Sequence, residues 1–201
     1  MWQLRLMRRG VEDSAVSARA AKDNAEAALT SVRTMRDAER AYVQMSHRAP
    51  GLVIQPVALN SGIARVSMKV KNFGRTPATV TGVVLKLDVR PNGNPLSPNP
   101  DYNSQDVQGP VRAFLVTKAN VIFTMAFDQT PINLNDLAAG KLMVRLYGYV
   151  DYIDQFGDRH RGGYARSYQQ VAENNLFFET QAGYNYDCLR GPGEGNDWEQ
   201  T

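Results

Sequence analysis

The sequence predicts a mainly β protein with a long N-terminal α-helix, and two observations favour this fold class. All ten prolines of the 201 residues, and 15 of the 16 glycines, lie after residue 49, so the first quarter of the chain nearly lacks the residues that interrupt helices. After residue 50, β-branched and alternating runs are separated by turn residues. We therefore expect a helical stalk over residues 1–46, followed by an antiparallel, immunoglobulin-like β-sandwich over residues 50–180.

The N-terminal segment combines a helix-forming composition with the spacing of a coiled coil. Nine of the residues from 15 to 41 are alanine, the strongest helix former. A heptad frame that starts at Leu4 places apolar residues at ten of its twelve a and d positions, as in helices that pair. This seam consists of Leu4, Met7, Val11, Ser14, Ala18, Ala21, Ala25, Ala28, Val32, Met35, Glu39 and Tyr42. We expect weak self-association through this helix, because alanine buries little area per layer.

The net charge of +3 belongs to the N-terminal segment. Residues 1–49 hold nine basic and six acidic residues, and the remainder of the chain holds fourteen of each. A nucleic-acid-binding protein needs a dense basic face, so we expect no nucleic-acid partner.

The first residues are typical of a segment beside a membrane. Trp2, followed by Arg5, Arg8 and Arg9, is the pattern found at the water side of a membrane span, and we interpret these four residues as membrane-proximal. An amphipathic helix on a membrane surface is the alternative. If a span precedes this segment, the basic residues place the chain at the cytoplasmic face; otherwise we expect a cytoplasmic protein.

Strands are expected from the β-branched and alternating runs after residue 50. Residues 64–71 alternate between apolar and polar side chains, which is the period of a half-buried strand. Further strands are expected over residues 52–59, 79–89, 112–118, 121–127, 141–153, 164–168 and 176–179, with a short helical turn at 133–139. Because no strand–helix–strand alternation occurs, a nucleotide-binding parallel fold is not expected. The tail, residues 189–201, has the composition of a disordered segment.

Two turn motifs carry the structural residues that we predict. Asn72, Gly74 and Pro77 lie in one of them, where glycine is available for positive φ. Gly157 lies in the other, inside Asp154-Gln155-Phe156-Gly157-Asp158. Asp154, Asp158 and His160 are the candidate metal ligands, and the alternative interpretation is that the aspartates cap the backbone of a hairpin turn.

Other candidate groups have ordinary structural interpretations. Cys188 is the single cysteine and lies far in sequence from both histidines, so we expect an idle thiol rather than a nucleophile. The proline-rich residues 91–110 form either a mobile loop or a binding loop. The late tyrosines are either packing residues or a recognition surface. No catalytic triad, phosphate loop or cofactor motif occurs, so we expect no cofactor and no catalytic residues.

The two motifs together resemble one family. Asn72-Phe73-Gly74-Arg75-Thr76-Pro77-Ala78 and the run Gly148-Tyr149-Val150-Asp151-Tyr152-Ile153-Asp154-Gln155-Phe156-Gly157-Asp158-Arg159-His160 follow an alanine-rich helix. The ensemble, over about residues 2–168, resembles a family of uncharacterised bacterial membrane-anchored proteins with N-terminal transmembrane segments, an alanine-rich helix and a small β-sandwich. The resemblance implies an anchor in the bacterial inner membrane and no known activity.

These observations predict a non-enzymatic binding or structural module, in which an oligomerising stalk presents a β-sandwich near a membrane. A metal-dependent binding domain or enzyme that uses Asp154, Asp158 and His160 is the alternative. The sequence does not identify a protein partner.

Overall fold

The computed structural model of the chain is mainly antiparallel β, with two sheets and one N-terminal helix. It describes residues 2–59, 61–97, 102, 112–169, 175–178, 184–185 and 187–190. The chain divides into two compact units, Met1–Arg40 and Ala41–Thr201. We refer to the second as the β unit.

The first unit consists of helix α1, Trp2–Glu39. It is shorter than the expected stalk of residues 1–46, and it ends before the seam residue Tyr42. Tyr42 is held by the β unit instead, because its carbonyl accepts a hydrogen bond from the N–H of Phe73 at 2.7 Å and its N–H lies 3.4 Å from Asn72 Oδ1. Pairing with a distant strand thus overrides the helical spacing of the local sequence.

The smaller sheet has three strands in the order β1-β2-β5. These strands are β1 Val43–Ala58, β2 Ser61–Asn72 and β5 Asn120–Asn133. β1 begins nine residues before the expected strand at Leu52, so residues 43–46 belong to the β unit and not to a stalk. Val43 is fully buried there, and this burial is the physical reason for the correction.

The larger sheet has six strands, with the path β4-β3-β6-β7-β8 and β9 paired to β7. Its members are β3 Ala78–Pro91, β4 Ala113–Leu115, β6 Leu142–Asp154, β7 Arg159–Gln169, β8 Asn175–Phe178 and β9 Asp187–Arg190. β9 contains Leu189 and Arg190, so the expected disordered tail of residues 189–201 is wrong for its first two residues. The rest of that tail lies outside the described residues. A short helix, α2 Leu134–Ala138, precedes β6, and the Asn133 side chain caps its N-terminus. The predicted helical turn at 133–139 is therefore confirmed.

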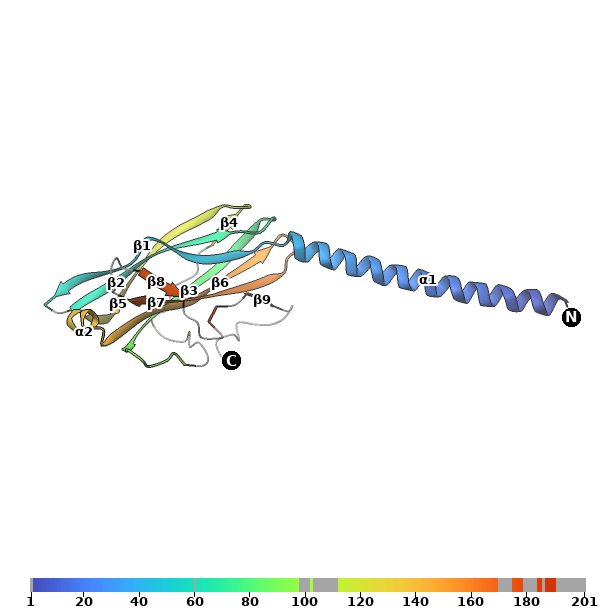
Figure 1. Ribbon diagram of the computed structural model, residues 1–201. Helices are drawn as coiled ribbons and strands as arrows, with labels where there is room; N and C mark the ends of the chain where they lie inside the picture. The colour runs from blue at the N-terminus through green and yellow to red at the C-terminus, as the bar shows by residue number, and fades with distance from the viewer. Residues whose placement is uncertain are drawn as a thin grey trace. The chain divides into compact units, whose positions relative to one another are not determined.

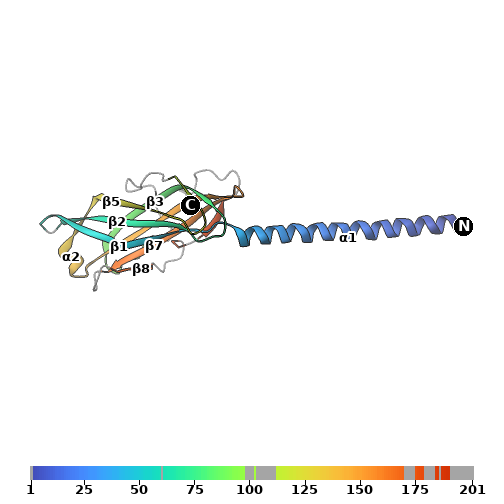
Figure 2. The ribbon, with the colours of Figure 1, turned by 90° about the horizontal axis from the view of Figure 1, so that it is seen from above.

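Figure 1 shows the strands of the two sheets. Side chains from both sheets form one hydrophobic core. The alternation predicted for residues 64–71 is confirmed, because Ala64, Val66, Met68 and Val70 are all fully buried. They pack with residues of the larger sheet such as Val150. β1, an edge strand of the smaller sheet, contacts β7 of the larger sheet (Figure 2).

A second apolar cluster covers the other face of the larger sheet. It consists of Leu96, Tyr102, Tyr147, Tyr149, Ala165 and Tyr184, with Val84 packed against it. Strand β6 is therefore buried on both faces over most of its length. Leu96 and Tyr102 come from the proline-rich segment 91–110, so two described residues of that segment are anchored on the sheet.

Candidate functional site

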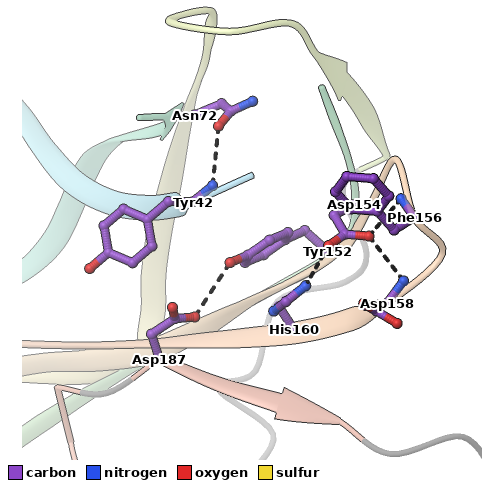
Figure 3. Close-up of polar contacts among 8 residues, drawn as sticks. All are labelled: Tyr42, Asn72, Tyr152, Asp154, Phe156, Asp158, His160 and Asp187. Atoms are coloured by element: carbon purple, nitrogen blue, oxygen red, sulfur yellow. Dashed lines mark hydrogen bonds and ion pairs between the residues drawn. The ribbon is translucent and has the colours of Figure 1, made fainter. Parts of the chain in front are cut away.

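The turn between β6 and β7 is built around the Asp154 carboxylate (Figure 3). Its Oδ1 accepts hydrogen bonds from the N–H groups of Phe156 at 2.9 Å and Asp158 at 3.0 Å. The Asp154 N–H in turn donates to the Asp158 carbonyl at 3.0 Å. Gly157 has φ of +85°, a conformation that glycine adopts without strain. This geometry is that of an Asx-supported hairpin.

His160 lies beneath this turn, on β7. Its Nε2 is 3.0 Å from Asp154 Oδ2, and its ring stacks on that of Tyr152 at a centroid distance of 4.9 Å. The Tyr152 hydroxyl donates to Asp187 Oδ1 at 3.4 Å (Figure 3). His160 is only 2% exposed, so the imidazole is part of the packed interior.

The three candidate metal ligands have separate structural roles. Asp154 and His160 bind each other, and the Asp158 backbone closes the turn. Within the part of the chain that the structure describes, no group of three or more His, Cys, Asp or Glu residues is placed to hold a metal ion. The geometry therefore supports the turn interpretation of these residues.

The turn between β2 and β3 is organised by the fully buried Asn72 side chain. Its Oδ1 accepts from the Gly74 N–H at 2.9 Å. Its Nδ2 donates to the carbonyls of Thr76 at 2.7 Å and Leu115 at 3.2 Å. Gly74 is not among the described residues with positive φ, so glycine freedom does not shape this turn. Pro77 directly precedes β3.

The predicted membrane-proximal residues Trp2, Arg5, Arg8 and Arg9 all lie in α1. No helix among the described residues is long and apolar enough to cross a bilayer.

Most of the late tyrosines are packing residues. Tyr147, Tyr149, Tyr152, Tyr164, Tyr168 and Tyr184 are each at most 5% exposed, whereas Tyr186 lies outside the described residues. Tyr149 also supports an ion pair, because Arg161 stacks on its ring at 3.5 Å while binding both oxygens of Asp151 at 2.7 Å. These contacts favour the packing interpretation over an exposed recognition surface.

A pocket of about 340 Å³ opens where β1 meets β7. It is lined by Tyr42, Gln44, Met45, Gly163, Tyr164, Arg166, Asn185 and Asp187. Gln44 and Asn185 are exposed, so the pocket is open to solvent, whereas Tyr164 and Arg166 are buried. The hydroxyl of Tyr42 accepts a hydrogen bond from Gln44 Nε2 at the rim. We call this the edge pocket.

Burial dominates the electrostatics of the edge pocket. It raises the pKa of Tyr164 well above its usual value, although the positive charge of Arg166 acts in the opposite direction. Burial also lowers the pKa of the Arg166 guanidinium, which lies over the Tyr164 ring at 4.7 Å. The raised pKa keeps the Tyr164 phenol neutral at neutral pH. A guanidinium in a protein stays protonated, so a neutral phenol lies beside a cation.

One side of the pocket is fixed by Asn185. Its Oδ1 accepts from the Ala165 N–H at 3.0 Å and from Arg166 Nη1 at 3.2 Å. Arg166 Nη1 also donates to the Ala165 carbonyl at 2.6 Å. The guanidinium thus has a defined position at the pocket.

Sequence reasoning missed the edge pocket because its residues come from three separate parts of the chain. The only local signal is the alternation of Tyr164, Arg166 and Tyr168 on one face of β7, which places a cation among inward-facing aromatic residues. Cys188, on the neighbouring β9, has a raised pKa because of its burial, so it remains a thiol and not the thiolate that a nucleophile needs.

Comparisons with known proteins leave the function open. No protein-family model matches the sequence, and no curated protein matches it significantly. One similar solved structure is Northeast Structural Genomics Consortium target SoR45, with 9% identity, a TM-score of 0.39 and coverage of 72% of this chain and 96% of that chain. Another, described as an ApaA protein from Bordetella pertussis, has 10% identity, a TM-score of 0.31 and coverage of 77% and 94% respectively. Likenesses at these scores carry no further argument.

Proposed function

We propose that the chain is a non-enzymatic binding and structural module, in which helix α1 self-associates and the β unit is an antiparallel, immunoglobulin-like sandwich. The observation that supports self-association is the exposure of the helix. Every residue from 13 to 39 is exposed, including the seam residues Val32 (54%) and Met35 (64%).

A second copy of the helix is the occupant that this seam fits. Apolar side chains gain free energy when they leave water, and the heptad spacing keeps them on one stripe that a parallel or antiparallel copy can cover. Ala21, Ala25 and Ala28 in the middle of the seam allow close approach of two backbones. Because each alanine layer buries little area, attachment to a membrane or a bound partner would strengthen the association by raising the local concentration.

We further propose that α1 lies beside the cytoplasmic face of a bacterial inner membrane. Trp2, Arg5, Arg8 and Arg9 support this placement, since all four lie in the first turns of α1 and basic residues near anionic lipids each contribute about 1 kcal/mol of attraction. The resemblance of the two turn motifs to a membrane-anchored family supports it independently.

Light scattering of the full chain tests self-association. Val32→Glu places a charge on the seam, and Val16→Glu makes the same change at an f position that is also exposed (66%). Both side chains are exposed, so both variants are expected to fold. The wild-type chain and Val16→Glu are expected to form dimers or higher oligomers at high micromolar concentration, and Val32→Glu is expected to be monomeric. A monomeric wild type, or equal behaviour of the two variants, would contradict the proposal.

Vesicle binding tests the membrane placement. The wild-type chain is expected to co-sediment with vesicles that contain anionic lipid at low salt and to dissociate at high salt. A triple Arg5→Gln, Arg8→Gln, Arg9→Gln variant is expected to remain in solution, whereas Arg33→Gln with Arg36→Gln in the last turns of α1 serves as the control for loss of charge elsewhere on the helix. Binding that is indifferent to salt or to the triple change would count against it.

A further inference from the structure

The smaller sheet and the loops beside it are rich in cations and poor in anions. Residues 41–87 contain six Lys and Arg and no Asp or Glu, and residues 112–127 contain two and none. These ranges supply β1, β2 and the first part of β5. In the sequence of these three strands, Asp128 is the one acidic residue. The charge is therefore segregated, although residues 50–201 are neutral as a whole.

Two of these cations lie at the centre of the outer face of the sheet, and a third lies beside them. Lys69 and Lys71 alternate with fully buried residues on β2, so their side chains point away from the core. β2 lies between β1 and β5 (Figure 2). The exposed Lys118 is next to the end of β2, because its N–H donates to the Asn72 carbonyl at 2.9 Å. Within the described residues, none of the three lysines forms an ion pair.

Exposed apolar side chains lie among these cations. Ile122 on β5 is directly opposite Lys69 and is 42% exposed. Phe73 is 50% exposed, and the Nζ of Lys71 lies over its ring at 4.6 Å. We call Lys69, Lys71, Phe73, Lys118 and Ile122 the basic face. Apolar groups that remain in water beside several cations mark a surface that binds something.

The loop that carries Lys118 is held in a strained conformation. Lys118 has φ of +65° and is the one non-glycine residue with positive φ in the part of the chain that the structure describes. The loop is fixed by a hydrogen bond from Thr117 Oγ1 to the Arg75 carbonyl at 2.7 Å and by one from the Ala119 N–H to the Val116 carbonyl at 3.0 Å. The surrounding structure thus keeps this cation at the surface.

We propose that the basic face docks the β unit onto a membrane surface that contains anionic phospholipids. The three lysines attract the lipid phosphates, and Phe73 and Ile122 enter the boundary between headgroups and acyl chains. This inference deepens the membrane placement proposed above and rests on it for the choice of a lipid partner. It uses residues of the β unit and none of α1.

The mixture of charge and apolar surface favours lipid over nucleic acid. Phosphates and sugars offer a partner to the lysines but none to Ile122, which gains free energy only when it leaves water. The half-exposed Asp158 lies at the same end of the β unit. It belongs to a turn of the larger sheet, on the other layer of the fold.

Co-sedimentation of the full chain over a range of lipid concentrations tests the proposal. The probe is a vesicle of phosphatidylglycerol and phosphatidylcholine, and vesicles of phosphatidylcholine alone are expected to bind little. Lys69→Gln with Lys71→Gln is expected to raise the lipid concentration for half-binding at least tenfold, since each cation contributes about fivefold. Lys86→Gln with Lys141→Gln, next to or within strands of the larger sheet, is the control and is expected to bind as the wild type does. Equal effects of the two pairs would overturn the proposal.

A second pair of variants tests the apolar contact. Phe73→Ser is expected to raise the lipid concentration for half-binding about fivefold, because less apolar surface leaves water. Leu59→Ser is the control, since Leu59 is 94% exposed in the turn between β1 and β2, at the other end of the sheet. Both side chains are exposed, so both variants are expected to fold. Unchanged binding of Phe73→Ser would overturn the choice of a membrane.

The same assay separates this inference from the placement of α1. Two contacts with one vesicle strengthen each other, so the loss of either is expected to weaken binding. If only the Lys69 and Lys71 pair weakens binding, the basic face stands and the placement of α1 fails. If only the Arg5, Arg8 and Arg9 triple change weakens binding, the basic face is overturned. A single-stranded oligonucleotide that displaces the chain from vesicles would also overturn the choice of lipid.

Discussion

Two turns of the β unit, one after β2 and one after β6, each place a buried Asn or Asp side chain against backbone groups. Asn72 is fully buried and Asp154 is 6% exposed. The Asn72 amide both donates and accepts, and it joins the turn to Tyr42 and Leu115, which lie 30 and 43 residues away. The Asp154 carboxylate only accepts, and its partners lie within six residues.

The difference shows what each side chain can do. A neutral amide with two donors and an acceptor can link three chain segments without carrying a charge into the interior. A buried carboxylate needs donors on both oxygens, which the two backbone N–H groups and His160 supply. Asn72 is therefore a tertiary connector, and Asp154 organises its own hairpin.

Replacement of Asn72 tests the connector role and is expected to have the largest effect. Asn72→Ala leaves the carbonyls of Thr76 and Leu115 and the N–H of Gly74 without their partner, so it should lower the free energy of unfolding by about 3 kcal/mol. Urea denaturation followed by near-ultraviolet circular dichroism measures it. Asn72→Asp, which keeps Oδ1 but loses both donors, should also be strongly destabilised. A loss below about 1 kcal/mol would show that the three segments hold together without the amide.

Removal of the Asp154 carboxylate is expected to lower the free energy of unfolding by less than Asn72→Ala does. Asp154→Ala leaves two backbone N–H groups and the buried Nε2 of His160 without their partner. The two N–H groups lie at a turn whose residues are partly exposed, so the expected loss of unfolding free energy is about 2 kcal/mol in the same urea experiment. Asp154→Asn keeps an acceptor for both N–H groups and should lose about half as much. If Asp154→Ala were as damaging as Asn72→Ala, the distinction between a local and a tertiary role would be wrong.

Glycine substitutions separate the two turns further. Gly157→Ala should lower the free energy of unfolding by about 1 kcal/mol, because φ is +85° there and an L side chain is strained in that conformation. A Cβ at this position would meet no atom of a non-adjacent described residue within 4 Å, so the cost is that of the backbone alone. Gly74→Ala should change stability by less than about 0.5 kcal/mol, since Gly74 does not need positive φ. Thermal and urea denaturation of the pair give the comparison directly.

Replacement of Thr76 is expected to have the smallest effect, and it should raise rather than lower the free energy of unfolding. Its Oγ1 is buried and has no hydrogen-bond partner among the described residues. Thr76→Val replaces that hydroxyl with a methyl group and should be neutral or stabilising by up to about 1 kcal/mol. A clear destabilisation would indicate that the hydroxyl takes part in the Asn72 network.

Sequence reasoning succeeded where the contacts are local and failed where they are distant. The alternation of residues 64–71 predicted β2 and its buried face, and the Asp154–Asp158 motif predicted a turn with Gly157 in it. The helix was extended too far, because Tyr42 fits the heptad seam and nothing local shows that Asn72 and Phe73 bind its backbone. Positive φ was predicted at Gly74, but the hydrogen bonds of the Asn72 side chain determine the conformation of that turn.

The sequence by itself determined the helical composition of residues 2–39, the strand periods and the local turn at Asp154, because neighbouring residues carry all the interactions that decide them. Only the tertiary structure decided where the helix ends, that β6 is buried on both faces, and that Tyr42, Tyr164, Arg166 and Asp187 line one pocket. The physical reason is that side chains far apart in the chain become neighbours only when both sheets have formed, and periodicity carries no record of those distant partners.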